Sequence, residues 1–365
     1  MKFLIFGTGK IAAQVMKAIG NVERYIEIVG IIDNDERKQN GMFYGKAVKS
    51  PSEVRNLEYD YICILAGEGY QNIYNQLVYG YHVEKHRVVD RLFLLKQVMT
   101  CKYRDDTDAD IRDTVSYWGR NRLSFFNQFE FAPASRERVW WDEDNNMPYV
   151  FFAGRRLYYP RTYRDIFAQD GSLWVTGYRE MEQHARSPHR YLNDEINIGE
   201  GDIVVDAGAR EGDFALPYMD KIKKLYLFEP DPGWVEALKM TYKDYGDKVV
   251  VIPKLLSDTV SENTITLMEA VSERTVDFIK MDIEGAEVKV LSAAEKMLRD
   301  SHIKGAICCY HKRGDECNII HIFHKNGYDC STSKGHVVFV DDPDIFETLD
   351  FRHGIVYVKK SESKK

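Results

Sequence analysis

The residues best placed to do chemistry lie where apolar runs end in acids and glycines. Residues 204–212 read Val-Val-Asp-Ala-Gly-Ala-Arg-Glu-Gly, so Asp206 closes a buried strand and Gly208 and Gly212 follow it. Glycines let the backbone turn sharply and approach a ligand closely. An acid at the strand end favours a cationic ligand over the anion of a phosphate loop, and S-adenosylmethionine carries an ammonium group. We therefore expect Asp206, Gly208 and Gly212 to bind that cofactor.

Two further polar positions fit the same ligand. Glu229 ends the next apolar run, in Tyr-Leu-Phe-Glu-Pro, and a carboxylate there can accept both hydroxyls of a ribose. The alternative is a solvated glutamate before a proline turn. Ser257 and Asp258 follow a third apolar run, where a polar side chain can meet an adenine amino group. These two residues fit an ordinary turn equally well.

A third acidic group marks the end of a strand and the start of a helix. Residues 276–287 read Val-Asp-Phe-Ile-Lys-Met-Asp-Ile-Glu-Gly-Ala-Glu. Ligands bind at the carboxyl ends of parallel strands, so Asp282 and Glu284 are interpreted as functional residues. Acids also favour the positive end of a helix, and we assign Glu287 mainly that role.

If this cofactor donates its methyl group to a hydroxyl, a base must remove the hydroxyl proton, and His311 is the leading candidate. It follows the apolar run 305–310, so its ring can open into the same crevice as Asp282. The ordinary pKa of histidine suits this task. The alternative is a surface histidine beside Lys312 and Arg313. Asp282, Glu284 and His311 could also hold a divalent ion, but no ligand spacing demands one, and we predict no metal.

Other histidines are weaker candidates. His184 and His189 flank Ser187-Pro188 just before the region that carries these motifs. They fit residues that close over a cofactor or an acceptor. They fit polar linker residues equally well.

The N-terminus carries a separate glycine motif. Gly7-Thr-Gly9-Lys-Ile-Ala12 follows an apolar run, and Asp33 closes the next one, as in the outline of a dinucleotide fingerprint. The motif predicts a nucleotide site at Gly7, Gly9 and Asp33. An NAD-dependent sugar-nucleotide oxidoreductase is one alternative, although no hydride-transfer residues can be named. A degenerate domain that serves only assembly is another.

Elements that can position these residues alternate between strands and helices. Residues 2–6, 26–32 and 59–65 read as strands of a first parallel sheet, with a helix over 11–19. Residues 99–165 are rich in acids and aromatic side chains, including Phe126, Phe129 and Phe131. They predict a helical and β connector with a hairpin over 149–159. Five strands then follow, over 203–207, 224–228, 248–252, 276–281 and 305–310, with a helix over 286–298. Residues 336–340 and 354–358 predict a terminal antiparallel hairpin.

Composition excludes several classes of protein. The 365 residues hold 50 lysines and arginines against 57 acids, a net charge of −7, which argues against a nucleic-acid partner. No stretch approaches the roughly 20 apolar residues of a membrane span. The six cysteines show no metal or disulfide spacing, so we expect reduced thiols, Cys63 and Cys308 among them buried, and a cytoplasmic protein.

The motifs together resemble a known family. Residues 206–212, Phe228-Glu229-Pro230, Ser257-Asp258 and 278–287 resemble the FkbM methyltransferases over about residues 180–312. That resemblance implies a class I fold, S-adenosylmethionine as methyl donor and O-methylation of sugars or related hydroxyls. By it, Asp206, Gly208, Gly212 and Glu229 bind cofactor, Ser257 and Asp258 flank adenine, and Asp282 and Glu284 line the methyl-transfer pocket.

The N-terminal stretches 29–35 and 48–51 resemble the N-terminal domain of sugar-nucleotide acetyltransferases. That resemblance implies a uridine-nucleotide or nucleotide-sugar site near Gly7, Gly9 and Asp33.

The expected molecule is therefore an α/β protein. A smaller Rossmann-like domain over residues 1–98 is followed by the connector over 99–165 and a seven-stranded methyltransferase domain over 166–360. We expect a small-molecule or glycan substrate. The oligomeric state is left open, and a non-catalytic nucleotide-binding scaffold is a further alternative.

Overall fold

A computed structural model describes residues 1–123, 125, 137–163, 172–173, 182–273 and 275–361. The chain divides into two compact units. Unit 1 comprises Met1–Gln128 and Val338–Phe351, and unit 2 comprises Phe129–Val337 and Arg352–Lys365. The predicted residues Phe126, Phe129 and Phe131 of the connector, and the start of the family resemblance near residue 180, lie outside the described residues.

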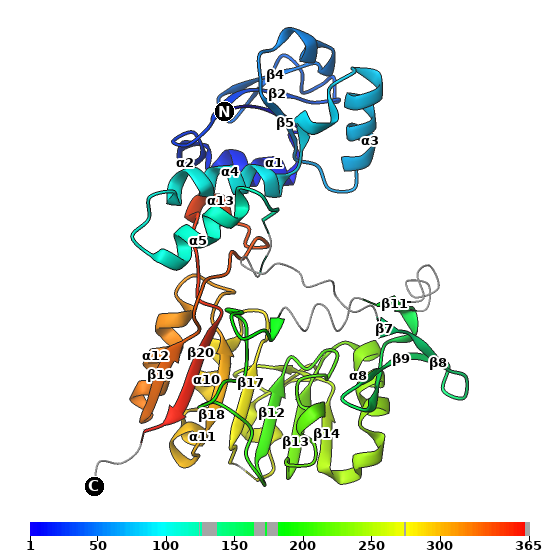
Figure 1. The fold of residues 1–365 in the computed structure, drawn as a ribbon, viewed down its shortest axis with the longest axis vertical. Helices are drawn as coiled ribbons and strands as arrows, with labels where there is room; N and C mark the ends of the chain where they lie inside the picture. The colour runs from blue at the N-terminus through cyan, green and yellow to red at the C-terminus, as the bar shows by residue number, and fades with distance from the viewer. Residues whose placement is uncertain (124, 126–136, 164–171, 174–181, 274, 362–365) are drawn as a thin grey trace. The chain divides into compact units, whose positions relative to one another are not determined.

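Unit 1 is built on a sheet with the strand order β3-β4-β2-β1-β5-β6 (Figure 1). All neighbouring strands are parallel except β3, which pairs antiparallel with β4 at one edge. The predicted Rossmann-like α/β unit is thus present. The strands are β1 (Lys2–Phe6), β2 (Glu27–Ile32), β3 (Met42–Phe43), β4 (Lys46–Lys49), β5 (Tyr61–Ile64) and β6 (Val88–Val89).

The helices of unit 1 extend beyond the predicted boundary at residue 98: α4 crosses it, and α5 and α13 follow it. They are α1 (Lys10–Lys17), α2 (Ile19–Val22), α3 (Tyr70–Asn75), α4 (Arg91–Tyr103), α5 (Ala109–Trp118) and α13 (Ile345–Thr348), with short turns over Pro51–Asn56, Gln76–Gly80 and Lys85–Arg87. Trp118, at the end of α5, is fully buried in the same core as Phe3 and Ile5 of β1. Residues 99–118 therefore complete this unit.

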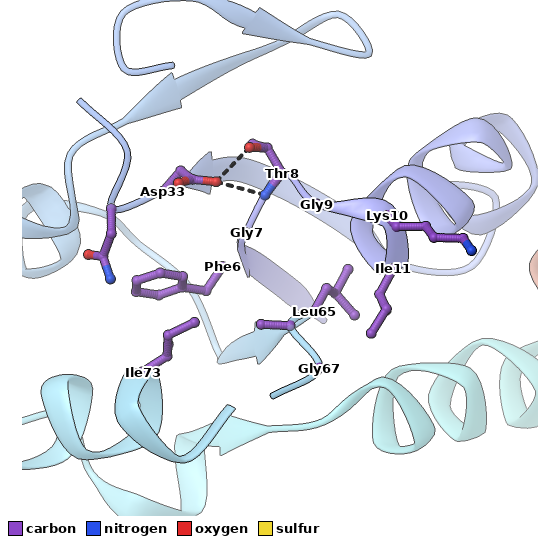
Figure 2. Close-up of a pocket in the computed structure, with 12 residues that line it drawn as sticks. Phe6, Gly7, Thr8, Gly9, Lys10, Ile11, Asp33, Leu65, Gly67 and Ile73 are labelled. Atoms are coloured by element: carbon purple, nitrogen blue, oxygen red, sulfur yellow. Dashed lines mark hydrogen bonds between the residues drawn. The ribbon is translucent and has the colours of Figure 1, made fainter. Parts of the chain in front are cut away.

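The loop after β1 is tied to the end of β2. The Thr8 amide and hydroxyl both donate to Asp33 Oδ2, at 2.8 and 2.5 Å (Figure 2). Gly7 adopts a left-handed φ of +114°, and a side chain there would lie 3.2 Å from the Leu65 carbonyl oxygen. Glycine at this position thus lets the loop pass close to the end of β5.

Unit 2 contains a seven-stranded sheet with the order β14-β13-β12-β17-β18-β20-β19 (Figure 1). Only β20 runs antiparallel to its neighbours. This is the class I methyltransferase sheet that the sequence predicts. Its strands are β12 (Ile203–Ala207), β13 (Lys224–Phe228), β14 (Val249–Ile252), β17 (Phe278–Met281), β18 (Lys304–Cys308), β19 (Tyr328–Thr332) and β20 (Ile355–Lys360).

Helices cover the sheet and bury its apolar side chains. They are α8 (Pro232–Thr241), α9 (Leu267–Ala270), α10 (Glu287–Ala293), α11 (Glu295–Asp300) and α12 (Asp315–Lys325), with short turns over Leu216–Tyr218 and Lys243–Lys248. The single helix predicted over 286–298 is interrupted, because Ala294 leaves helical geometry with ψ of 12°. A short parallel pair, β15 (Leu255–Leu256) and β16 (Thr264–Ile265), lies between β14 and α9 in the chain.

A smaller sheet precedes the main one. It consists of β8 (Trp140–Asp142), β9 (Met147–Phe152) and β10 (Arg155–Tyr158), while β7 (Glu137–Arg138) pairs with β11 (Ser172–Leu173), and a turn covers Arg161–Tyr163. The predicted hairpin over 149–159 is confirmed. The Tyr158 amide donates to Thr241 Oγ1 at 3.0 Å, which attaches this sheet to the end of α8.

The predicted final hairpin is wrong at its first strand. Residues 336–340 form only an isolated bridge between Val337 and Arg352, and β20 pairs instead with β18 and β19. Val338 begins a segment, Val338–Phe351, that leaves unit 2, carries α13 and belongs to unit 1. Val338 is apolar because it is fully buried in the core of unit 1, and not because it lies in a strand. All six cysteines are free, with Cys63 and Cys308 buried as expected. Among the described residues, no helix is long and apolar enough to cross a membrane.

Candidate functional site

The glycine loop and Glu229 meet at the carboxyl edge of β12 and β13. Glu229 is 7% exposed, and its two oxygens accept hydrogen bonds from the Arg210 amide at 3.0 Å and the Asp231 amide at 2.9 Å. Arg210 adopts a left-handed φ of 39°. The carboxylate therefore fixes the shape of the loop and faces it, as the sequence interpretation requires.

Gly208 brings this loop against the neighbouring strand end. Its φ is +78°, and a Cβ atom there would lie 1.9 Å from the Asp282 carbonyl oxygen. Gly212 has a φ of +73°, and a Cβ atom there would lie 2.3 Å from Leu238 Cδ2 on α8. Both glycines are therefore required by close packing as well as by backbone conformation.

Asp206 lies inside the sheet, paired with a lysine of the neighbouring strand. Its carboxylate is fully buried, and Oδ1 lies 3.0 Å from Lys280 Nζ, which also donates to the Gly208 carbonyl oxygen at 2.6 Å. Burial raises the pKa of Asp206 to about 6, although Lys280 opposes this shift. The pair supports the glycine loop from inside the sheet, and contact of Asp206 with a cofactor stays a prediction.

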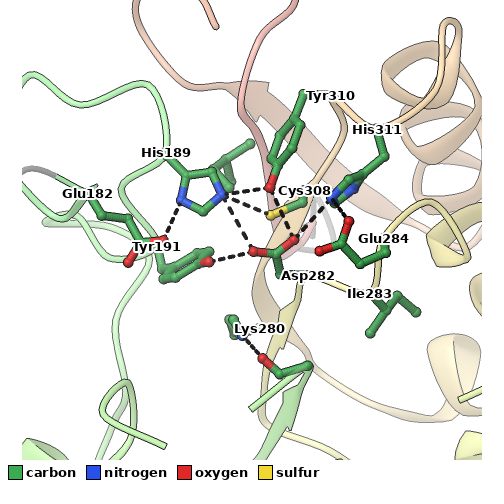
Figure 3. Close-up of polar contacts among 12 residues, drawn as sticks. Glu182, His189, Tyr191, Lys280, Asp282, Ile283, Glu284, Cys308, Tyr310 and His311 are labelled. Carbon is green, nitrogen blue, oxygen red and sulfur yellow. Dashed lines mark hydrogen bonds and ion pairs between the residues drawn. The ribbon is translucent and has the colours of Figure 1, made fainter. Parts of the chain in front are cut away.

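Asp282 lies at the centre of a polar network (Figure 3). Its Oδ2 accepts a hydrogen bond from Tyr191 Oη at 2.9 Å and lies 3.6 Å from His189 Nε2. Its Oδ1 accepts from Tyr310 Oη at 3.3 Å and lies 3.4 Å from His311 Nε2. Burial favours the neutral acid, but the bond to His189 and the charges around it outweigh burial and lower the pKa of Asp282.

His311, the predicted base, lies in this network rather than on the surface. Its side chain is 4% exposed, and Nδ1 lies 3.1 Å from Glu287 Oε1 while Nε2 faces Asp282. Burial lowers the pKa of His311, but the contact with Glu287 reverses the effect, and the net result is a raised pKa. Glu287 keeps its expected place at the helix start, since Oε1 accepts the Ile283 amide at 2.9 Å.

His189 forms a second histidine–glutamate pair on the other side of Asp282. Its Nδ1 lies 3.0 Å from Glu182 Oε1, and Nε2 lies 3.2 Å from Tyr310 Oη and 3.5 Å from Cys308 Sγ. Burial disfavours its charge, but the bonds to Asp282 and Glu182 raise the pKa of His189 to about 9. The Asp282 carboxylate thus lies between two imidazoles, and the Nδ1 atom of each imidazole contacts a glutamate.

The remaining predicted residues lie at the periphery. The Glu284 side chain is 86% exposed, with Oε2 3.6 Å from His311 Nε2. Asp258 is exposed, accepts from Ser257 Oγ at 3.1 Å and pairs with Lys289 Nζ at 2.9 Å. Their contact with adenine stays a prediction. His184 is exposed, and its Nδ1 accepts the Arg186 amide at 3.2 Å.

Sequence reasoning missed several members of the network. They are the buried or half-buried polar residues Glu182, Tyr191, Lys280, Cys308 and Tyr310. Lys280 carried a usable signal, because a lysine inside an apolar strand needs a buried anionic partner. Tyr191 carried none, since it comes from the segment before β12, which has no regular secondary structure around His189. Glu182 belongs to the same segment, where only the family resemblance pointed to residues 182–184.

Some side chains of the network around Asp282 are of the types that bind metal ions. One ligand atom each of Asp282, Glu287 and His311 lies within 4.8 Å of the others, and the same holds for His189, Asp282 and Cys308. Glu287 thus takes the place that the sequence interpretation gave to Glu284. Hydrogen bonds and ion pairs among these groups already account for their arrangement.

Comparison with known proteins identifies two parts of the chain. Residues 1–89 match the family model described as C2185-like, N-terminal, and residues 254–330 match the methyltransferase FkbM domain. No curated protein matches the chain. The resemblance of the N-terminal part to acetyltransferases is not confirmed.

Solved structures similar to the chain include several methyltransferases. The methyltransferase FkbM from Methylobacillus flagellatus KT is 16% identical, with 98% of this chain and 89% of that chain covered and a TM-score of 0.43. A putative methyltransferase from Streptococcus mutans, solved in complex with SAH, is 13% identical, with 46% and 92% covered and a TM-score of 0.30. The FkbM match over residues 254–330, on a class I sheet, shows that the protein is an enzyme, a methyltransferase.

Proposed function

We propose that the protein transfers a methyl group from S-adenosylmethionine to a hydroxyl group of a sugar, glycan or nucleotide sugar. The observation that carries this proposal is the buried Glu229 carboxylate facing the Gly208–Gly212 loop, at the same sheet edge as Asp282. Ligands of open α/β sheets bind at this edge. The FkbM match supports the assignment of the reaction class.

The residues of the loop fit the nucleoside part of the cofactor. Each oxygen of Glu229 accepts one backbone amide, and a carboxylate oxygen can accept two hydrogen bonds, so acceptor capacity remains for two ribose hydroxyls. The positive φ angles of Gly208 and Arg210 expose the loop backbone for close approach. When bound, the cofactor supplies an activated methyl group on a cationic sulfur.

His311 is proposed as the base that removes the acceptor proton. Glu287 faces Nδ1 and so favours the tautomer with its proton on that nitrogen, which leaves Nε2 to accept a proton. A negative Asp282 beside Nε2 stabilises the imidazolium that forms. Because the same contacts raise the pKa of His311, the free base is a stronger proton acceptor but is populated only at higher pH.

The polar character of the network supports a hydroxyl-bearing acceptor. Two tyrosine hydroxyls surround the Asp282 carboxylate. Tyr191 Oη lies 2.9 Å from Asp282 Oδ2, and Tyr310 Oη lies 3.3 Å from Asp282 Oδ1. The hydroxyl and carboxylate oxygens keep acceptor positions beyond these bonds, and such positions form directional hydrogen bonds with alcohols. This favours a sugar-like substrate.

Calorimetric titration with S-adenosylhomocysteine tests the cofactor site. We expect the wild-type protein to bind it and Glu229→Ala to bind at least tenfold more weakly, because the ribose hydroxyls lose their acceptor and the loop loses two backbone anchors. Glu236→Ala is the matched control: this acid lies seven residues on, in α8, and pairs with Arg161. Equal affinity in all three proteins, with folds confirmed by circular dichroism, would refute the assignment.

A further inference from the structure

Unit 1 contains a pocket that the methyl-transfer reaction does not use. It has a volume of about 380 Å³ and lies at the carboxyl ends of β1, β2 and β5 (Figure 2). β1 is the central strand of this parallel group, with β2 on one side and β5 on the other. Open α/β sheets hold ligands at such a point, where the chain leaves the sheet in opposite directions.

One end of the pocket is suited to an anion. Gly9, Lys10 and Ile11 line it, and α1 begins at Lys10. Gly9 provides no side-chain cap and the first turn of α1 contains no acid, so the amides at the positive end of the helix are left for a ligand. Lys10 is exposed and adds a full positive charge. A phosphate group is the anion that such a turn binds best.

Asp33 supplies the carboxylate of the pocket, which Thr8 and Asn34 also line. Its side chain is 13% exposed, Oδ2 accepts the Thr8 amide and hydroxyl, and Oδ1 accepts the Asp35 amide at 2.8 Å. Three of about four acceptor positions are therefore filled. The remaining position on Oδ1 can accept one hydroxyl group.

Apolar side chains form one wall of the pocket. Ile11 comes from α1, Leu65 follows β5, and Ile73 comes from α3. Gly67 adds backbone without a side chain. An apolar wall opposite an anion site and a hydroxyl acceptor suits a flat heterocycle attached to a ribose.

We infer that this pocket binds the ribose 5′-diphosphate unit of a nucleotide. The diphosphate lies at the Gly9–Ile11 turn, one ribose hydroxyl donates to Asp33, and the base packs on Ile11, Leu65 and Ile73. The unit is shared by nucleoside diphosphates, their sugar esters and dinucleotides such as NAD. This inference does not depend on the proposed methyl-transfer reaction, since its residues all belong to unit 1.

Titration of the full-length protein with UDP, ADP and NAD tests the inference, with S-adenosylhomocysteine present at saturation so that unit 2 cannot contribute. Binding of UDP or ADP assigns the site to nucleoside diphosphates, and tighter binding of NAD assigns it to dinucleotides. Absence of binding by all three at millimolar concentration would overturn the proposal. The proposal would also be overturned if the nucleotides gave binding heat without S-adenosylhomocysteine but none in its presence.

A matched pair at Gly9 separates charge from shape. Gly9 has a φ of −82°, and a Cβ atom there meets nothing within 4 Å, so both Gly9→Asp and Gly9→Asn can be accommodated and can cap α1. We expect Gly9→Asp to bind the nucleotide at least tenfold more weakly than Gly9→Asn, with a thermal midpoint no lower. Equal affinity of the two variants would contradict a diphosphate at this turn. Unchanged affinity for S-adenosylhomocysteine shows that the effect is confined to unit 1.

Discussion

Asp282 is held by side chains from two other stretches of the chain. His189 and Tyr191 come from the segment before β12, Asp282 follows β17, and Tyr310 and His311 follow β18. Each histidine has a glutamate at its Nδ1 atom and Asp282 near its Nε2 atom. Such an arrangement orients both rings, and both side chains are buried.

Replacing His311 by glutamine tests its role as the base. His311→Gln keeps a polar side chain of similar size but cannot accept and carry a proton, so we expect turnover to fall 10²- to 10⁴-fold. Affinity for S-adenosylhomocysteine should change less than threefold. His324→Gln, on the exposed side of α12, is the matched control and should keep full turnover. Single-turnover methyl transfer from labelled cofactor to a panel of sugars measures the effect.

Retained turnover in His311→Gln would remove this residue as the base. A parallel loss of cofactor affinity would instead indicate a structural role. The pH profile distinguishes these further: since the pKa of His311 is raised, wild-type turnover should rise with pH through a value above 6.5, and this limb should be absent in the variant.

His189 should make stability depend on pH. Its pKa rises from 6.5 in the unfolded chain to about 9 in the folded one, so protonation favours folding. The contribution is complete below about pH 6.5 and is lost as the pH rises through 9. A shift of this size is worth on the order of 3 kcal/mol. We therefore expect the stability difference between wild type and His189→Gln to shrink between pH 6.5 and 9.5, measured by urea unfolding.

A constant difference across this range would show that His189 does not carry a proton in the folded protein. His302→Gln is a suitable control, because this histidine is exposed and lies before β18. Its effect on stability should be small at both pH values.

The sequence identified the part of this site that lies at strand ends. Asp282 and His311 follow apolar runs, and such positions converge at one sheet edge whatever the loops do. Tyr191 and Glu182 could not be found this way, because no periodic pattern fixes where an irregular segment lies. Glu284 is exposed while Glu287 is buried, and a single sequence does not reveal which acid of a strand-end cluster is buried, so the role of Glu284 stays a prediction.

At the scale of elements, the contact between the glycine loop and the end of β17 is the tightest feature of the site. Gly208→Ala would place a Cβ atom 1.9 Å from the Asp282 carbonyl oxygen and would also hold alanine at a φ of +78°. Gly201→Ala is the matched control, since Gly201 has a φ of +80° with nothing within 4 Å. The control should cost about 1–2 kcal/mol of folding free energy, the strain of a left-handed alanine.

We expect Gly208→Ala to cost at least 2 kcal/mol more than Gly201→Ala, because β12 and β17 must move apart to relieve the clash. Urea unfolding measures both losses. Cofactor affinity should fall in the first variant only. Equal stability of the two variants would show that the loop can move without disturbing Asp282.

Elements with strong patterns were predicted well, and the exceptions have local causes. Four inner strands of unit 2, β12, β13, β17 and β18, are near-continuous apolar runs, which is typical of strands buried on both faces. Residues 336–340 have the same appearance, yet Val338 packs with helices of unit 1 instead. A short apolar run indicates that a segment is buried, but it does not indicate which part of the protein covers that segment.

At the scale of the whole molecule, the chain leaves unit 2 near its end and returns. Val337 and Arg352 exchange both backbone hydrogen bonds, at 2.8 and 3.0 Å, so the excursion begins and ends at one point. The residues between them carry α13, whose Ile345 and Phe346 are buried in the core of unit 1. The chain therefore passes between the two units three times, after residues 128, 337 and 351. The boundaries predicted at residues 98, 165 and 360 differ from these three points.

This connectivity predicts how the protein tolerates truncation. A variant lacking residues 1–128 keeps the excursion but loses the core that buries Val338, Ile345, Phe346 and Leu349. Exposing four such side chains costs roughly 2 kcal/mol each and creates a surface prone to association. We expect this variant to aggregate on size-exclusion chromatography.

Replacing residues 338–351 by Asn-Gly in the same truncation should restore a monodisperse protein. Val337 and Arg352 are already paired antiparallel, and a two-residue turn is the shortest natural connection for such a pair. Unit 2 keeps all of its own core residues, so S-adenosylhomocysteine should bind with an affinity within threefold of the full chain. If the first truncation is equally soluble, the excursion does not need unit 1 for burial. If the second also aggregates, unit 2 depends on more of the N-terminal chain than this excursion.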